Sequence, residues 1–204
     1  GAKGSMLWSH ASPERFGVFT STDNGTTWKP PTSTVLSGVQ IVALTVDPNT
    51  GAVYATSNGH GIFKTTNGGK TWRAINTGLS RLIISSIAVV HGTLYASAMD
   101  NTATGVGLYK STDGGQSWQR AHHGLTSSLV RYVTADGGVP GVLYAATATG
   151  VFKSSDGAAT WRSATQGLGA AMVAVLLVDP QNPSILYAGT DAHGVFKSSN
   201  RGAS

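Results

Sequence analysis

Short apolar segments alternate with turn residues along the whole chain. In one representative stretch, segments rich in Val, Ile, Tyr, Phe, Trp and Thr occupy residues 39–46, 52–56, 62–65 and 71–75. Asp-Pro-Asn-Thr-Gly, Asn-Gly and Asn-Gly-Gly sequences separate them, and such residues favour tight turns between strands. No segment keeps apolar residues at helical spacing over ten residues. The pattern therefore predicts four short antiparallel strands, which we term A, B, C and D.

The four-strand unit recurs at a nearly constant period. The segment that begins at Gly17 returns, with variations, in copies that begin at Gly61, Gly107, Gly150 and Gly194, and the fifth copy stops before a Trp. Four strands in each period of about 40–50 residues are typical of a propeller blade. We therefore predict an all-β fold, a β-propeller of four-stranded antiparallel blades, with about five blades.

The C–D hairpins carry the sequence Ser-x-Asp-x-Gly-x-x-Trp or a close variant of it. This motif resembles the Asp-box, or BNR repeat, of sialidases, xyloglucanases, sortilin-type receptors and photosystem II assembly factors. An Asp or Asn side chain accepts hydrogen bonds from turn N–H groups, so we expect a structural role for these positions. The resemblance indicates architecture rather than function, because it includes enzymes and binding proteins alike. The motif positions are Asp23, Trp28, Asn67, Trp72, Asp113, Trp118, Asp156, Trp161 and Asn200.

The repeats predict one domain with two incomplete blades. Residues 1–5 resemble a remnant of cloning, and residues 6–204 form a single propeller domain with repeats of about 44 residues. The blade at 6–36 lacks strand A and the blade at 172–204 lacks strand D, which gives 18 strands. Either the chain closes as five blades, or it is a piece of a larger propeller that closes by association. Open strand edges at both ends would favour self-association.

Composition removes several function classes. Charged residues make up 11 % of the chain, with 14 Lys and Arg against 9 Asp and Glu, and cysteine is absent. The chain therefore has no disulfide, thiolate metal site or cysteine nucleophile. No apolar run approaches the length of a membrane helix, and no nucleic-acid motif is present. Most aromatic residues occupy repeat positions, which weakens the interpretation as a polysaccharide-binding cleft. One strand C position is basic in four blades, and we expect these lysines to face solvent, with a belt for a polyanion as the alternative.

The B–C and D–A loops form the face on which we expect a site. These loops vary in sequence, whereas the C–D hairpins are nearly identical, and variable loops on a rigid scaffold usually carry function. We expect neither a metal site nor a cofactor there, since the histidines fit turn or solvated positions. The candidate binding residues of this face are Arg15, His60, Arg81, Asp100, His122, His123, Asp191 and His193.

A glycosidase interpretation requires two carboxyl groups flanking the scissile bond. Asp191 with Asp100 or Glu14 is the best pair that the loop face offers. The segment 187–191 is similar to a blade segment that bears a catalytic Asp in xyloglucanases. The sialidase interpretation fails, because the chain has no Arg-Ile-Pro motif.

The leading hypothesis is a non-catalytic binding or scaffold propeller for a protein or glycan partner, acting through the B–C/D–A loop face. The alternatives are a xyloglucanase-like glycoside hydrolase or a fragment of one, an assembly factor that docks a protein through a basic patch, and an excised or engineered propeller fragment without activity. The resemblance implies a secreted or periplasmic protein.

Overall fold

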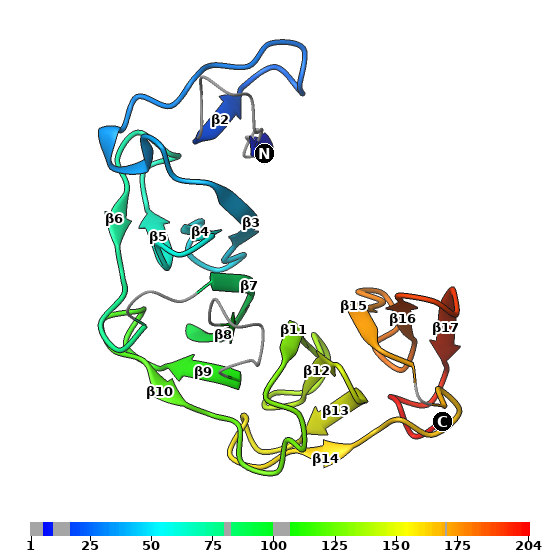
Figure 1. The fold of residues 1–204 in the computed structure, drawn as a ribbon. Helices are drawn as coiled ribbons and strands as arrows, with labels where there is room; N and C mark the ends of the chain where they lie inside the picture. Colours follow the sequence, from blue (N-terminus) through cyan, green and yellow to red (C-terminus); the bar gives the residue numbers. More distant parts are fainter. Residues whose placement is uncertain (1–5, 10–16, 80–82, 100–106, 170) are drawn as a thin grey trace.

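Five antiparallel sheets follow one another along the chain as the blades of a propeller. The computed structural model describes residues 6–9, 17–79, 83–99, 107–169 and 171–204. Figure 1 shows the sheets side by side around an open arc, with the first and last blades at its two ends. We number the blades 1 to 5 in chain order. The predicted all-β propeller is confirmed.

Blades 2, 3 and 4 are four-stranded meanders in which each strand pairs with its neighbours in sequence. Strand D, the outermost strand, is only two residues long in each of these blades. Their strands are β3 (Ile41–Val46), β4 (Val53–Ser57), β5 (Ile62–Thr65), β6 (Arg73–Ala74), β7 (Ile83–Val90), β8 (Thr93–Met99), β9 (Gly107–Ser111), β10 (Gln119–Arg120), β11 (Val130–Ala135), β12 (Leu143–Thr147), β13 (Gly150–Ser154) and β14 (Arg162–Ser163).

The two terminal blades have fewer strands. Blade 5 contains β15 (Val173–Val178), β16 (Leu186–Thr190) and β17 (Val195–Ser198), as the sequence predicted. Blade 1 contains only β1 (Met6–Ser9) and β2 (Val18–Ser21). The described residues therefore form 17 strands, and the prediction of a strand D in blade 1 is wrong.

Two prolines explain the missing strand of blade 1. Lys29 exchanges two backbone hydrogen bonds with Thr20, at 3.1 and 2.8 Å, and forms a single bridge. Pro30 and Pro31 follow at once. Proline has no N–H to donate, so the ladder ends there. A 3₁₀ turn, η1 (Thr34–Leu36), then leads to blade 2.

The hydrophobic core lies between blades. Strands β4 and β12 are buried along their whole length, because each lies inside a sheet whose faces pack on neighbouring blades. Four apolar clusters each combine residues of two successive blades. The cluster between blades 2 and 3, for example, contains Ile62 and Ile75 from one blade and Leu94 and Trp118 from the other. The described residues contain no helix that is long and apolar enough to span a bilayer.

Candidate binding face

Only some of the candidate residues of the B–C and D–A loops lie within the described residues. The described candidates are His60, His122, His123, Asp191 and His193. The other candidates, which lie outside the described residues, are Glu14, Arg15, Arg81 and Asp100.

An ion pair joins blades 4 and 5 at this face. The Nη1 atom of Arg131 lies 2.9 and 3.1 Å from the two carboxylate oxygens of Asp191. The backbone N–H of Asp191 donates to the carbonyl of Met172 at 3.1 Å, which holds the loop after β16 against the start of strand A. The two side chains are 34 % and 43 % exposed. The pair is therefore accessible to a partner.

Sequence reasoning did not single out Arg131, because this residue lies in a strand rather than in a loop. Strand β11 bulges there, since Val130 pairs with Thr147 and Tyr132 pairs with Ala146. A bulge redirects the side chain of its extra residue. The same irregularity recurs in every described strand A, and Arg131 is its one charged member. The bulged residues are Val42, Ser85, Arg131 and Ala174. A charged residue at a repeat position that is uncharged in the other blades was therefore the sequence feature that could have identified Arg131.

The described carboxylates are all engaged within the chain. Asp47 accepts hydrogen bonds from the N–H of Asn49 and the hydroxyl of Thr50, within the turn after strand A. Asp136 and Asp179 accept backbone N–H bonds in the equivalent turns of their own blades. The described part of the chain therefore offers Asp191 alone as an acidic group of the loop face.

The histidines of the loops between strands B and C, His60 and His193, are turn residues. His60 places Nδ1 3.1 Å from the carbonyl of Asn58, and its own carbonyl accepts a bond from the Asn76 side chain at 2.9 Å. The backbone N–H of His193 donates to the Thr190 hydroxyl at 3.0 Å. These histidines belong to blades 2 and 5, which the intervening blades separate (Figure 1). The structure does not bring them together.

The histidine pair after β10 lies between blades 3 and 4. The carbonyl of His123 accepts the backbone N–H of Trp161 at 2.9 Å, and its side chain is exposed. His122 is half-buried beside Gly107, and its Nδ1 atom has no hydrogen-bond partner among the described residues. Within the described ranges, no group of three or more His, Asp or Glu side chains is arranged to hold a metal ion.

Three of the four repeated lysines of strand C are only partly exposed and connect neighbouring blades, so the expectation that they face solvent is wrong for these three. The ammonium nitrogen of Lys110 lies 5.7 Å from the centre of the Tyr95 ring and donates to the carbonyl of Gly157, in the next blade, at 2.9 Å. Such a cation over an aromatic ring is stabilising. Burial raises the pKa of Tyr95, so this hydroxyl remains a donor. The same arrangement joins Lys64 to Tyr54 and Gly114, and Lys153 to Tyr144 and Arg201.

The Asp-box carboxylates are occupied inside their own hairpins. In blade 4, Asp156 accepts bonds from the N–H of Thr160 at 2.9 Å, from the Thr160 hydroxyl at 2.5 Å and from the Ser154 hydroxyl at 2.8 Å. These bonds, the Thr160 hydroxyl first, lower the pKa of Asp156 to about 2. The equivalent bonds lower the pKa of Asp23 to about 2 and that of Asp113 further still. An anion with such a low pKa is a poor proton donor or base at neutral pH.

Solved propellers share this blade arrangement. A GH74 xyloglucanase from Xanthomonas campestris superimposes with a TM-score of 0.73 and 19 % identity, over 92 % of this chain and 34 % of that one. YCF48 bound to a D1 peptide gives 0.68 and 15 %, over 97 % and 61 %. A chain of a nidogen/laminin complex gives 0.64 and 17 %, over 91 % and 70 %. This chain spans about a third of the xyloglucanase, and at these identities the likeness shows the fold alone.

The family follows from the sequence itself. No curated protein matches the chain significantly. The family model described as the DUF6242 beta propeller domain matches residues 38–177, which is more than half of the chain. The protein therefore belongs to the family of the DUF6242 beta propeller domain.

Proposed function

We propose that this propeller is a non-catalytic binding or scaffold module that takes a protein or glycan partner on its B–C/D–A loop face. The observation that carries the proposal is the ion pair of Arg131 with Asp191. Asp191 is the strongest catalytic candidate of the loop face, and its two oxygens are bound to a cation. A glycosidase would need a second carboxyl group on the other side of the glycosidic bond, and the described part of the loop face supplies none.

The same pair offers binding chemistry. A guanidinium has five N–H donors in a planar fork, and only the Nη1 group of Arg131 contacts Asp191. The remaining donors make no hydrogen bond within the described residues. They suit a carboxylate, a peptide carbonyl or a sugar hydroxyl, because each of these oxygens accepts hydrogen bonds. Asp191 fixes the guanidinium in place before the partner arrives, which reduces the entropy lost on binding.

Two solved neighbours support a protein partner. YCF48 was solved with a D1 peptide, and the other neighbour is a chain of a nidogen/laminin complex. In both cases a chain of similar fold was solved together with another polypeptide. We propose that the present chain also binds another polypeptide, and the proposal depends on the exposed guanidinium of Arg131 that Asp191 holds in place.

The test compares three proteins on a peptide array and a glycan array: the wild type, Arg131→Ala, and Arg162→Ala as a matched control. Arg162 is exposed in β14, on the outer edge of blade 4. We expect at least one array ligand whose affinity falls tenfold or more in Arg131→Ala and stays unchanged in Arg162→Ala. The absence of any ligand, or an equal loss in both variants, would contradict the proposal.

A hydrolysis assay separates this role from the enzymatic alternative. Xyloglucan is the natural probe, given the fold of the xyloglucanase neighbour. We expect no release of reducing ends above the buffer rate. Hydrolysis by the wild type that Asp191→Asn abolishes would overturn the proposal in favour of a glycoside hydrolase.

A further inference from the structure

The B–C loop of blade 2 corresponds to that of blade 5 residue by residue. Asn58 takes the place of Asp191, and each of them lies two residues before a histidine and three before a glycine. The backbone N–H of Asn58 donates to the carbonyl of Gln40 at 3.0 Å, as that of Asp191 donates to the carbonyl of Met172 at 3.1 Å. The two loop positions are therefore equivalent, and Asn58 carries an amide where blade 5 carries a carboxylate.

Asn58 is followed by a glycine, and this order of residues favours loss of the side-chain amide. The backbone nitrogen of Gly59 can attack Cγ of Asn58, because glycine has no side chain that obstructs the approach. The two reacting groups belong to adjacent residues, so the reaction is intramolecular and needs no other molecule to bring them together. Asparagine is thermolabile in proteins through this chemistry.

Three Asn-Gly steps occur in the chain, at Asn24, Asn58 and Asn67. All three asparagines are exposed, so contact with solvent does not distinguish them. The reaction requires Cγ and the following backbone nitrogen to approach each other, and a hydrogen bond that fixes either group opposes this movement. The three sites therefore differ in the hydrogen bonds that must break first.

The box amide of Asn67 is held at both its oxygen and its nitrogen. Oδ1 accepts the hydroxyl of Thr65 at 2.9 Å and the backbone N–H of Thr71 at 3.0 Å, and Nδ2 donates to the Thr71 hydroxyl at 2.8 Å. Ring closure at this site would break the contacts that form the box turn. The native fold therefore protects Asn67.

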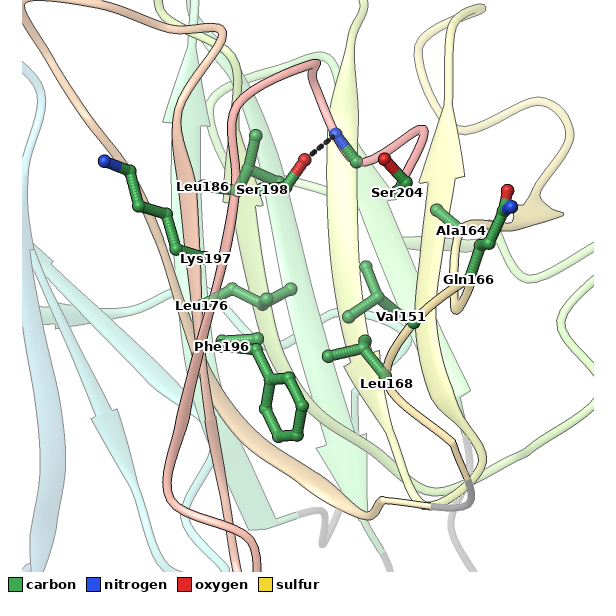
Figure 2. A pocket seen from close by; sticks show the side chains of 13 residues that line it. Val151, Ala164, Gln166, Leu168, Leu176, Leu186, Phe196, Lys197, Ser198 and Ser204 are labelled. Carbon is green, nitrogen blue, oxygen red and sulfur yellow. Dashed lines mark hydrogen bonds between the residues drawn. The ribbon is translucent and has the colours of Figure 1, made fainter.

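At Asn24 the attacking nitrogen, rather than the amide, is engaged. The N–H of Gly25 donates to the Ser21 hydroxyl at 2.8 Å. The same bond recurs in all five box turns. Figure 2 shows it in blade 5, where the Ser198 hydroxyl accepts the N–H of Gly202 at 3.0 Å. A nitrogen whose proton is held in this way cannot attack until the turn opens.

Asn58 has neither form of protection. Its amide makes one hydrogen bond, from Nδ2 to Oε1 of Gln40 at 3.1 Å, and both of these residues are exposed. Neither Oδ1 of Asn58 nor the N–H of Gly59 makes a hydrogen bond within the described residues. A Cβ atom added at Gly59 would meet nothing within 4 Å, so the space that a cyclic imide needs is open.

We propose that Asn58 is a self-modification site, at which the side-chain amide is converted into a carboxylate on the loop face. The nitrogen of Gly59 gives its proton to solvent and forms a bond to Cγ of Asn58. The bond from Cγ to the amide nitrogen breaks, and this nitrogen takes up a proton and leaves as ammonia. Water then opens the cyclic imide. Breaking the new bond gives aspartate, and breaking the original peptide bond gives isoaspartate.

The product adds an acidic group to the loop face at the repeat position of Asp191. Blade 5 accommodates a carboxylate there with the same backbone hydrogen bond, so an aspartate fits the loop of blade 2. The intervening blades separate the two positions, so the new group forms no pair with Asp191 (Figure 1). The conversion lowers the net charge of +5 by one unit and places an anion near His60. This inference does not depend on the partner proposed for the loop face.

The test follows amide loss in the folded protein during incubation in mildly alkaline buffer at physiological temperature. Peptide mass spectrometry measures the converted fraction at Asn24, Asn58 and Asn67 in the same sample, so each site is a control for the others. We expect conversion at Asn58 to be at least tenfold faster than at either other site, with aspartate and isoaspartate as products. Isoaspartate identifies the cyclic imide, because direct hydrolysis of the amide gives aspartate alone.

Two variants and one change of conditions locate the cause. Asn58→Gln keeps an amide but should abolish conversion at this position, because the longer side chain closes a larger and less favourable ring. Thr71→Ala removes the hydroxyl that accepts Nδ2 of Asn67 and should accelerate conversion at that site alone. A thermal melt shows whether each variant is folded. In concentrated urea, which opens the turns of the wild type, the three asparagines should convert at similar rates, whatever the variants show.

Several outcomes would overturn the proposal. The first is no conversion at Asn58 in the folded protein over a period in which the urea-unfolded chain converts. The second is conversion at Asn24 or Asn67 that is as fast as at Asn58 in the folded protein. The third is a product that contains aspartate without isoaspartate. Each of these would show that the native loop of blade 2 does not direct ring closure to Asn58.

Discussion

Arg201 of blade 5 binds Asp136 of blade 4, with Nε 3.0 Å from Oδ2. The Asp136 side chain is fully buried, whereas 41 % of the Arg201 side chain is exposed. Arg201 takes the box position that Gly114 and Gly157 hold in the two preceding blades. Its φ of 56° lies in the left-handed region that favours glycine. The strained backbone and the ion pair therefore occur at one residue.

Removing the Arg201 side chain should destabilise the contact between blades 4 and 5. Arg201→Ala leaves the Asp136 carboxylate buried without its cation, and an unpaired buried group costs about 1–3 kcal/mol. Because Arg201 is partly exposed, we expect the lower part of that range, about 1–2 kcal/mol of unfolding free energy. Urea unfolding followed by circular dichroism measures the change.

Two further variants separate the causes. Arg201→Gly removes the same ion pair but relieves the left-handed φ, so it should cost less than Arg201→Ala. Arg162→Ala removes an exposed arginine of blade 4 and should change stability by no more than about 0.5 kcal/mol. A loss in Arg201→Ala no larger than that of Arg162→Ala would show that the pair contributes nothing.

The Asp boxes make stability depend on acid pH. The pKa of Asp23 and that of Asp156 are lowered from 3.8 to about 2 in the folded chain, chiefly by the hydroxyls of Thr27 and Thr160. The unfolded chain therefore binds protons more readily than the folded chain between these values. Their contribution to stability is fully present above about pH 4 and is lost as the pH falls towards 2. Urea midpoints between pH 2 and 6 should show this decline.

An asparagine at the box position serves as the control for acid sensitivity. Asn67 already replaces the carboxylate in blade 2, where its Oδ1 atom accepts the N–H of Thr71 at 3.0 Å. Asp156→Asn should therefore keep the hairpin at pH 6 and flatten the decline below pH 4. An unchanged slope in this variant would falsify the assignment of the acid sensitivity to the boxes.

Sequence periodicity predicted the strands within blades much better than the contacts between them. The expected segment at 62–65 coincides with β5, and that at 39–46 begins two residues before β3, because these patterns depend on local alternation and turns. The failure in blade 1 was also local, since Pro30 ends the bridge that Lys29 starts. The two consecutive prolines, Pro30 and Pro31, are the sequence signal that ends the strand.

Contacts between blades could not be predicted from the period. Arg131 meets Asp191 across 60 residues of chain, because a bulge turns one side chain towards the next blade. Lys110 resembled a surface residue in the repeat, yet the next hairpin covers it. In both cases the deciding quantity is the position of one blade relative to another, which a repeat of four strands does not encode.

Lysines at the same repeat position should differ in their effect on stability. Lys110 donates to the carbonyl of Gly157 in the next blade, and Lys197 lies over the Tyr187 ring, at 5.9 Å, without a described acceptor beyond blade 5. Lys110→Met should lower the unfolding free energy by about 1 kcal/mol, since it removes a charged hydrogen bond at a partly exposed site. Lys197→Met should change it by less than half of that. Equal urea midpoints for the two variants would exclude the role of Lys110 as a connection between blades.

Substitutions of the box tryptophans should differ most in their effect on the unfolding free energy, because only some of these rings are enclosed by two blades. Trp161 is 3 % exposed and its indole N–H donates to the Ala121 carbonyl, whereas Trp28 is 37 % exposed. Trp161→Ala should lower the unfolding free energy by about 3–5 kcal/mol, as is usual for a large core ring. Trp28→Ala should cost less than about 1 kcal/mol.

A phenylalanine at position 161 separates the contribution of the apolar ring to stability from that of the indole hydrogen bond. Trp161→Phe keeps most of the apolar contact but leaves the Ala121 carbonyl without its donor, so it should fall between the wild type and Trp161→Ala. Urea unfolding with an unchanged slope would attribute the differences to the folded state rather than to the compactness of the unfolded chain. If Trp28→Ala is as damaging as Trp161→Ala, burial between blades is not what makes these rings stabilising.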